Sequence, residues 1–299
     1  MTTPVKLDLT SSLLLFALAS VWGGSFFFAE IALAEVPPLT ITLHRVFWAA
    51  PLLVLIVHLA GYSLPKDIRT WGAYLGMGAL NNAIPFSLIF WGQSQIDSGL
   101  ASILNGTTAM FGAVVAGLLL RDEPLTLNKL AGAGLGLIGV GLIMGPEALL
   151  DFNLANLAQI AILAASLSYA FASVWGKTFL SSQPPLMNAC GMVIGSSVLM
   201  IPLVLTVDGM PSFALSAPVW AVLLSLSSLS TVLAYGLYFA ILKRAGAANL
   251  MLVTLLIPPF AIALGSGFLG ERLPSSAWVG FAVIAIGFAV TDGRMFGKR

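Results

Sequence analysis

The sequence predicts an all-α integral membrane protein of ten transmembrane helices, arranged as two inverted five-helix repeats around a central cavity. The 299 residues are 59% hydrophobic and 8% charged, with a mean hydropathy of +0.99, so a soluble fold would expose too much apolar surface. Apolar windows long enough to cross a bilayer recur along the whole chain. The two halves also resemble each other at a spacing of 147 to 149 residues.

The expected spans follow one another with short polar connections. Glu30 and Arg45 are charged side chains that lie inside spans. The lone cysteine, Cys190, also lies inside a span, so no intramolecular disulfide is expected. The ten ranges are 13–33, 39–60, 71–91, 99–120, 127–145, 157–176, 186–207, 219–242, 250–269 and 275–291.

Three sequence blocks recur in the same order in both halves. On this repeat we divide the chain into a first five-helix unit, 1–146, and a second, inverted unit, 147–299. An odd number of spans per copy inserts the second copy upside down, and a site between inverted repeats is the architecture of alternating-access transporters. The blocks align 18–38 with 165–185, 71–90 with 220–239, and 123–139 with 271–287.

Basic residues predict the orientation. With the N-terminus inside, eleven lysines and arginines fall on the cytoplasmic side, whereas Arg45 and Arg272 fall on the far side. This bias follows the positive-inside rule and predicts that both termini are cytoplasmic. The eleven are Lys6, Lys66, Arg69, Arg121, Lys129, Lys177, Lys243, Arg244, Arg294, Lys298 and Arg299.

Two patterns resemble functional motifs without the context that those motifs require. Gly134-x-Gly136-x-x-Gly139 matches a dinucleotide fingerprint, but it lies in an apolar window with no preceding strand, so close helix packing is the better interpretation. His44 and His58 have no carboxylate or cysteine partner at ligand spacing, so no metal is expected. No nucleophile, base and acid cluster together, and we predict neither an enzyme nor a cofactor.

Polar and aromatic side chains at the middle of spans are the candidates for a substrate-binding cavity, because buried polar groups in a bilayer usually face the bundle interior. The first, third, fourth, sixth, eighth and ninth spans carry them. For the serines from 225 to 230, packing is an equal alternative, since hydroxyls can bond back to their own helix. The candidates are Trp22, Ser25, Asn81, Asn82, Tyr169 and Tyr235.

Glu30 and Arg45 are predicted to lie at one depth near the outer face, as an ion pair or gating contact. Each is seven residues from the Pro37-Pro38 turn. A hydrogen bond from His44 to Glu30 is an alternative, and proton coupling through Glu30 is a weaker one, because paired charges are the usual way to contain the cost of intramembrane charge.

The chain resembles the EamA branch of the drug/metabolite transporter superfamily. The resemblance rests on ten spans in paired halves, Trp22-Gly23 in the first span, and Glu-x-Leu at Glu123 and Glu271. Within that branch it is most similar to the YddG-type exporters of aromatic and other neutral amino acids. The resemblance implies a basket of ten helices in a bacterial inner membrane that exports small metabolites.

The expected function is therefore a secondary transporter exporting neutral or zwitterionic metabolites, above all amino acids including aromatic ones. Alternatives are the same fold exporting sugars, nucleotide-linked sugars or cationic drugs, or a channel or membrane enzyme. The expected partners are a small-molecule substrate and the lipid bilayer, with no nucleic acid. The sequence leaves open the substrate range, the coupling ion, the conformation, and whether the protein is a monomer or a homodimer.

Overall fold

The structure is a computed structural model in which residues 8–145 and 153–292 are described. Within these ranges the chain is helical apart from short turns and connections, and it contains no strand. The elements are α1 (Leu9–Leu33), α2 (Pro38–Leu59), α3 (Ile68–Gly78), η1 (Ala79–Ala83), α4 (Ile84–Gln93), α5 (Ser98–Asn105), α6 (Thr108–Leu119), α7 (Leu127–Met144), α8 (Leu154–Phe179), α9 (Pro185–Val207), α10 (Ala217–Ser227), η3 (Ser228–Leu233), α11 (Ala234–Leu250), α12 (Val253–Leu264), η4 (Gly265–Leu269) and α13 (Ser275–Asp292).

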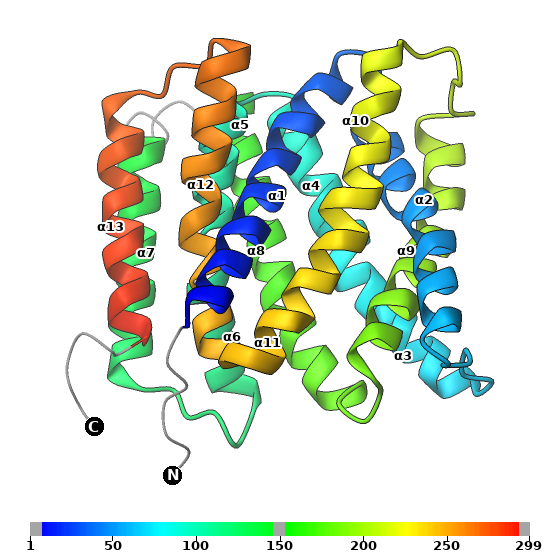
Figure 1. Ribbon diagram of the computed structural model, residues 1–299. Coiled ribbons are helices and arrows are strands. Elements are labelled where there is room, and N and C mark those ends of the chain that lie inside the picture. Colours follow the sequence, from blue (N-terminus) through cyan, green and yellow to red (C-terminus); the bar gives the residue numbers. More distant parts are fainter. Residues whose placement is uncertain (1–7, 146–152, 293–299) are drawn as a thin grey trace.

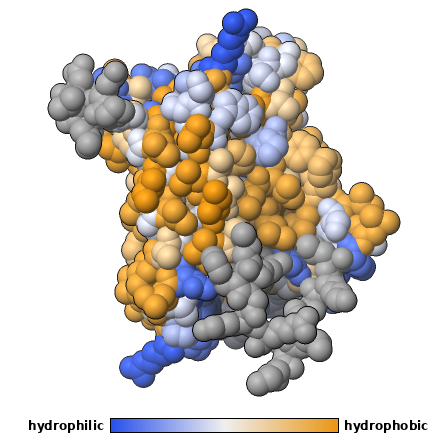
Figure 2. Space-filling view, turned by 90° about the vertical axis from the view of Figure 1, so that its left-hand side faces the viewer, coloured by the Kyte–Doolittle hydropathy of each residue, from blue (hydrophilic) through white to orange (hydrophobic). Residues whose placement is uncertain are grey.

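Eight continuous helical stretches of the described chain are long and apolar enough to cross a membrane. Two shorter apolar helices, Val253–Leu269 and Ser275–Thr291, bring the number to ten. Figure 2 shows hydrophobic residues across the middle of one face, with hydrophilic residues toward both ends. The predicted all-helical membrane fold of ten helices is thus confirmed. The helix ends lie within about four residues of the expected ranges except in α11, which continues past the expected end at 242 to Leu250.

The two halves run in opposite directions. The α1 helix starts at the lower end of Figure 1, where Asp8 pairs with Arg244 of α11 at 3.0 Å. The α8 helix ends at that same lower end, where Lys177 meets Glu123 of the α6–α7 connection at 2.7 Å. Thus α1 runs upward and its counterpart α8 runs downward, which is the relation expected of inverted repeats.

Helices α7 and α13, the last of each half, pack backbone against backbone. A Cβ on Gly280 would lie 2.6 Å from the carbonyl oxygen of Gly139, and one on Gly287 would lie 2.7 Å from that of Gly132. Only glycine permits so close an approach, as in other small-residue interfaces between membrane helices. The glycine pattern of α7 therefore serves helix packing, as predicted.

Two repeat-related helices are interrupted by π-helical segments. The η1 segment (79–83) joins α3 to α4, and η3 (228–233) joins α10 to α11 at the equivalent place 149 residues later. After η1, Pro85 lacks the amide that would continue the regular hydrogen-bond ladder. In η3 the Thr231 hydroxyl bonds to the Leu226 carbonyl at 2.9 Å, and such back-bonding bends helices. Segments of this kind are frequent at functional sites.

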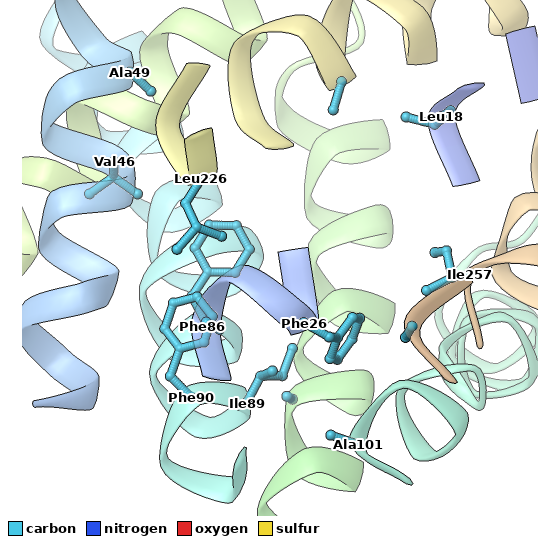
Figure 3. Packing of buried hydrophobic residues seen from close by; sticks show 14 of the residues in the cluster. Leu18, Phe26, Val46, Ala49, Phe86, Ile89, Phe90, Ala101, Leu226 and Ile257 are labelled. Atoms are coloured by element: carbon cyan, nitrogen blue, oxygen red, sulfur yellow. The ribbon is translucent and has the colours of Figure 1, made fainter. Parts of the chain in front are cut away.

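Large apolar side chains fill the space beside these interruptions (Figure 3). Phe86 and Phe90 of α4 stack with their centroids 6.3 Å apart, and both belong to the same buried cluster as Leu226 of α10 and Phe26 of α1. None of the four is more than 6% exposed. Close packing in the cluster therefore fixes α1, α4 and α10 relative to one another, and with them the polar groups of η1 and η3.

Candidate functional site

The side chains of η1 form a hydrogen-bonded network with α9 and α11. The Asn81 Nδ2 donates to the Tyr235 hydroxyl at 3.4 Å and to Asn82 Oδ1 at 3.2 Å, and Tyr235 donates to that same Oδ1 at 3.1 Å. The Asn82 Nδ2 donates to Ser196 Oγ at 3.2 Å and to the Met192 carbonyl at 3.5 Å. Three predicted site residues, Asn81, Asn82 and Tyr235, are therefore brought together.

The equivalent segment η3 holds Arg45 of α2. The Arg45 Nε donates to Thr231 Oγ1 and its Nη2 donates to the Ser230 carbonyl, both at 3.2 Å. The guanidinium also lies 3.9 Å from the centre of the Phe86 ring, a cation–π contact. Only 6% of Arg45 is exposed. The irregular backbone of η3 thus supplies acceptors that the guanidinium satisfies.

Tyr169 of α8 joins the same region. Its hydroxyl lies within electrostatic range of Arg45 and of the Tyr235 hydroxyl. The neighbouring Ser168 donates to the Leu80 carbonyl at 2.7 Å, which ties α8 to η1. Tyr169 and Tyr235 therefore lie near Arg45, and Tyr235 also belongs to the η1 network.

The two candidates from α1 behave differently from each other. Trp22 lies 6.1 Å from Tyr238 of α11 between ring centroids, in a tilted arrangement. Ser25 is 7% exposed, and its hydroxyl donates to the Trp22 carbonyl of its own helix at 2.6 Å. Trp22 therefore faces α11, whereas the Ser25 hydroxyl is satisfied within α1.

Several of these residues combine contacts between helices with accessible surface. Trp22, Asn81, Tyr169 and Tyr235 are only partly buried. Because their polar or aromatic partners come from other helices of the bundle, this accessible surface faces the interior rather than lipid. The residues thus offer aromatic surface, amides and hydroxyls to a small molecule in the bundle.

The expected ion pair between Glu30 and Arg45 does not form in this structure. The Glu30 carboxylate accepts a hydrogen bond from Gln93 Nε2 at 3.3 Å, and Gln93 also donates to the Phe26 carbonyl at 2.9 Å. The alternative partner, His44, instead accepts at Nδ1 from Trp48 Nε1 at 2.9 Å. Counting residues from a turn estimates depth along each helix but not the direction in which a side chain points, so the pairing prediction was wrong.

Arg45 is the site residue whose surroundings the sequence reasoning missed. The second span was not among the six expected to line the cavity, but as α2 it places a buried cation against η3 and α4. The available signal was the repeat, which aligns Ser230 and Thr231 with Asn81 and Asn82. That alignment indicated where acceptors would gather, but not which helix would supply the donor.

An aromatic cluster occupies the upper part of α2 and α10, separate from the two networks. The Trp48 ring stacks with His44 at 6.4 Å between centroids, and Trp220 meets His44 edge-on at 5.5 Å. Trp220 also stacks with Phe213 at 6.1 Å. Tryptophans near the end of a span, such as Trp220, are typical of the membrane interface.

The chemistry of the site is that of binding. It contains amides, phenols, aromatic faces and one guanidinium, which can hold a polar head group and an apolar side chain. In the part of the chain that the structure describes, no three histidine, cysteine or acidic side chains gather as metal ligands. Two surface hollows, of about 440 and 280 Å³, lie elsewhere, beside the 61–66 connection and beside Glu271.

Comparison with known proteins adds the family. The sequence model of the EamA-like transporter family matches twice, at residues 9–145 and 156–291. A solved crystal structure superposes with a TM-score of 0.68 at 17% identity, over 98% of this chain and 99% of that one, which supports the fold.

Curated relatives match along nearly the whole chain. The Bacillus subtilis (strain 168) protein "Uncharacterized transporter YoaV" is 25% identical over 89% of this chain and 91% of its own. The Escherichia coli (strain K12) "Uncharacterized inner membrane transporter YedA" is 27% identical over 92% and 88%. A "Probable amino-acid metabolite efflux pump" of Salmonella typhimurium is 26% identical over 93% and 92%.

Proposed function

This chain belongs to the EamA-like transporter family and is a multi-pass membrane transporter, not an enzyme; we propose that it exports amino acids, aromatic ones among them, by alternating access. The relative from Salmonella typhimurium whose name specifies amino-acid metabolite efflux supports this substrate class. The proposed substrate class is the same as that of the YddG-type exporters.

One observation supports this proposal above the others. Interruptions at equivalent places in the two inverted halves each carry a polar cluster, and Tyr235, which belongs to the first cluster, lies within electrostatic range of Arg45 in the second. Sites of inverted-repeat transporters lie at the repeat interface and are built from interrupted helices. A substrate held there would contact both halves, as a change of access from one side to the other requires.

The side chains suit an amino acid with an apolar or aromatic side chain. Trp22 and Tyr169 supply faces on which an aromatic ring can stack. Asn81, which is only partly buried, supplies an amide for the charged backbone ends of the substrate, and the fully buried Asn82 holds Asn81 and Tyr235 in place through its amide oxygen. A cationic drug would need an acidic partner, but Arg45 places a positive charge here instead.

We also propose that the upper end of Figure 1 faces outward and the lower end faces the cytoplasm of a bacterium. The basic residues that the positive-inside rule assigns to the cytoplasm include Lys177 and Arg244, which lie at the lower end. Reporter fusions at positions 66, 129 and 299 should give cytoplasmic signals, and fusions at 97 and 208 should give external ones. An external signal at 299 would overturn this orientation.

Flux in proteoliposomes tests the function. Uptake of labelled phenylalanine should saturate with substrate and be inhibited by other neutral amino acids, as expected of a carrier. Non-saturating flux would indicate a channel, and no flux of any amino acid would overturn the proposal.

Variants of the site separate the roles of its residues. Replacing Trp22 or Tyr169 by alanine should weaken transport of phenylalanine more than that of threonine, by about 2- to 10-fold, because a stacking partner is lost. Replacing Asn81 or Asn82 should lower transport of both amino acids alike. Trp48→Ala is the matched control, because Trp48 lies in the separate cluster with His44 and Trp220, and it should leave substrate preference unchanged.

A further inference from the structure

The guanidinium of Arg45 is buried without an acidic partner among the described residues. Its hydrogen bonds go to neutral oxygens, Thr231 Oγ1 and the Ser230 carbonyl. The salt bridges of the described chain join other residues, Lys177 and Arg244, to carboxylates. Burial of a charge is costly unless it is paired, so such a position favours an anion that arrives from outside the protein.

The Arg45 guanidinium also has N–H groups that its hydrogen bonds do not use. A guanidinium carries five N–H groups, and the hydrogen bonds of Arg45 use Nε and Nη2. Among the described residues, the hydrogen bonds of Arg45 leave the remaining nitrogen, Nη1, without an acceptor. A carboxylate is the group that a guanidinium binds best, because two N–H groups along one edge of its plane can donate two parallel bonds.

The neighbours of Arg45 fit a carboxylate that is part of a larger substrate. The Phe86 ring covers the guanidinium at 3.9 Å and excludes water there. The Tyr169 and Tyr235 hydroxyls lie within electrostatic range, and Tyr235 bonds directly to the Asn82 amide. An anionic group on Arg45 would therefore lie near these two phenol hydroxyls, and Tyr235 in turn contacts Asn81, the partly buried amide of η1.

We infer that Arg45 binds the carboxylate of the transported substrate and restricts transport to molecules that carry one. This inference rests on the proposed export of amino acids and adds the group that selects them. A requirement for a carboxylate would distinguish amino acids from the amines that carry the same side chains. The bonds to Thr231 and Ser230 hold the guanidinium in place before the substrate arrives.

The first test uses the unaltered protein. Thermal melting in detergent should show stabilisation by phenylalanine and by 3-phenylpropionate, which retains the carboxylate but lacks the ammonium group. Phenethylamine, which lacks the carboxylate, should need an at least about tenfold higher concentration to give the same rise in melting temperature. This difference is expected for loss of a charged hydrogen bond. Equal stabilisation by phenethylamine and 3-phenylpropionate would overturn the inference, whether or not any variant folds.

The second test uses Arg45→Gln and Arg45→Lys in proteoliposomes, with Arg69→Gln as the matched control at an exposed position of α3. The glutamine variant should lose about 10- to 100-fold in apparent affinity for phenylalanine while its affinity for phenethylamine is unchanged. The lysine variant should recover part of the loss, because it restores charge without the planar geometry. A folded Arg45→Gln protein that transports phenylalanine with unchanged affinity would show that Arg45 is only structural.

The two proposals can fail separately. If no amino acid is transported but carboxylates stabilise the protein through Arg45, the amino-acid function falls and the carboxylate site stands. If amino acids are transported equally well by Arg45→Gln, the function stands and the inference falls. Inorganic phosphate is included as a competitor, and a preference for it over 3-phenylpropionate would overturn the carboxylate assignment.

Discussion

The upper and lower ends of the bundle in Figure 1 are joined by different kinds of contact. At the upper end, carboxylates of the second half accept hydrogen bonds from helix starts of the first half. Glu271 accepts from the backbone amides of Ser98 at 3.0 Å and Gly99 at 3.1 Å, which open α5. Asp208 accepts from the Thr40 amide at 3.0 Å and so caps α2. These charge-assisted bonds connect the two repeats directly.

The lower end is joined by ion pairs on the surface. Lys177 meets Asp122 and Glu123, each at 2.7 Å, and Arg244 meets Asp8 at 3.0 Å. The side chains in these pairs are between 39% and 67% exposed. Solvent screens exposed ion pairs of this kind, so each contributes little and the lower end is held less firmly.

The difference arises at equivalent positions of the repeat. Glu123 corresponds to Glu271, 148 residues later, and Glu30 corresponds to Lys177, 147 residues later. At the lower end the two positions carry opposite charges and pair. At the upper end Glu30 lies within electrostatic range of Glu271 with the same charge, and Glu271 binds the α5 amides instead. One charge difference thus gives a firmly tied end and a weakly tied end.

Removing the Glu271 carboxylate should have the largest effect on this asymmetry. Glu271→Ala deprives two amides of α5 of their acceptor, and it should cost on the order of 2 kcal/mol or more. The matched variant Glu123→Ala removes only exposed pairing and should cost about 0.5 kcal/mol. Melting temperatures in detergent, measured at one salt concentration, give the comparison.

Salt provides the internal control for that experiment. The cost of Glu123→Ala should shrink further at high salt, because exposed ion pairs are screened. The cost of Glu271→Ala should persist. Equal costs for the two variants would show that the two ends are equally firm and would remove the basis of the comparison.

Replacing Glu30 tests the like-charge contact. Glu30→Gln removes the repulsion with Glu271 and keeps an oxygen that can accept from Gln93. The melting temperature should therefore be unchanged or slightly raised, by less than about 1 kcal/mol in stability. The pairing with Arg45 that the sequence suggested predicts the opposite sign, so a clear loss of stability would restore that hypothesis.

The fold was largely predictable because the lipid bilayer restricts which structures can cross it. A bilayer requires long apolar helices. The repeat, together with the odd number of spans in each copy, predicted from the sequence alone that the second half is inverted. The helix interruptions were only partly predictable. Pro85 marks the first, whereas the second depends on the serine and threonine hydroxyls of η3, whose bonding pattern the sequence does not specify.

The candidate site was predictable in its residue types but not in its contacts. Asn81, Asn82 and Tyr235 were chosen by depth and do meet. Arg45 was assigned to the wrong neighbour, because position along a helix estimates height and says little about the rotation of that helix. Glu30 was misassigned for the same reason.

The smallest expected effect concerns Glu35, which ties the α1–α2 turn to the segment before α10. Its carboxylate accepts from the Ser216 amide at 2.9 Å. Hydrogen bonds from the Ser216 side chain and backbone lower the pKa of Glu35. Asp67, which is the repeat equivalent of Ser216, instead caps its own helix, α3, by accepting from the Thr70 amide at 2.7 Å.

Because the folded pKa of Glu35 is lowered, its contribution is present above the ordinary value of about 4.3 and is lost as pH falls through the folded pKa. Glu35→Gln should therefore lower the melting temperature slightly at neutral pH, and the difference from the unaltered protein should vanish under acidic conditions. Asp67→Asn is the control, since asparagine caps a helix as well as aspartate does, and it should change little. A Glu35→Gln effect that stays constant from neutral pH to pH 3 would show that the tie between the two halves at this point does not depend on charge.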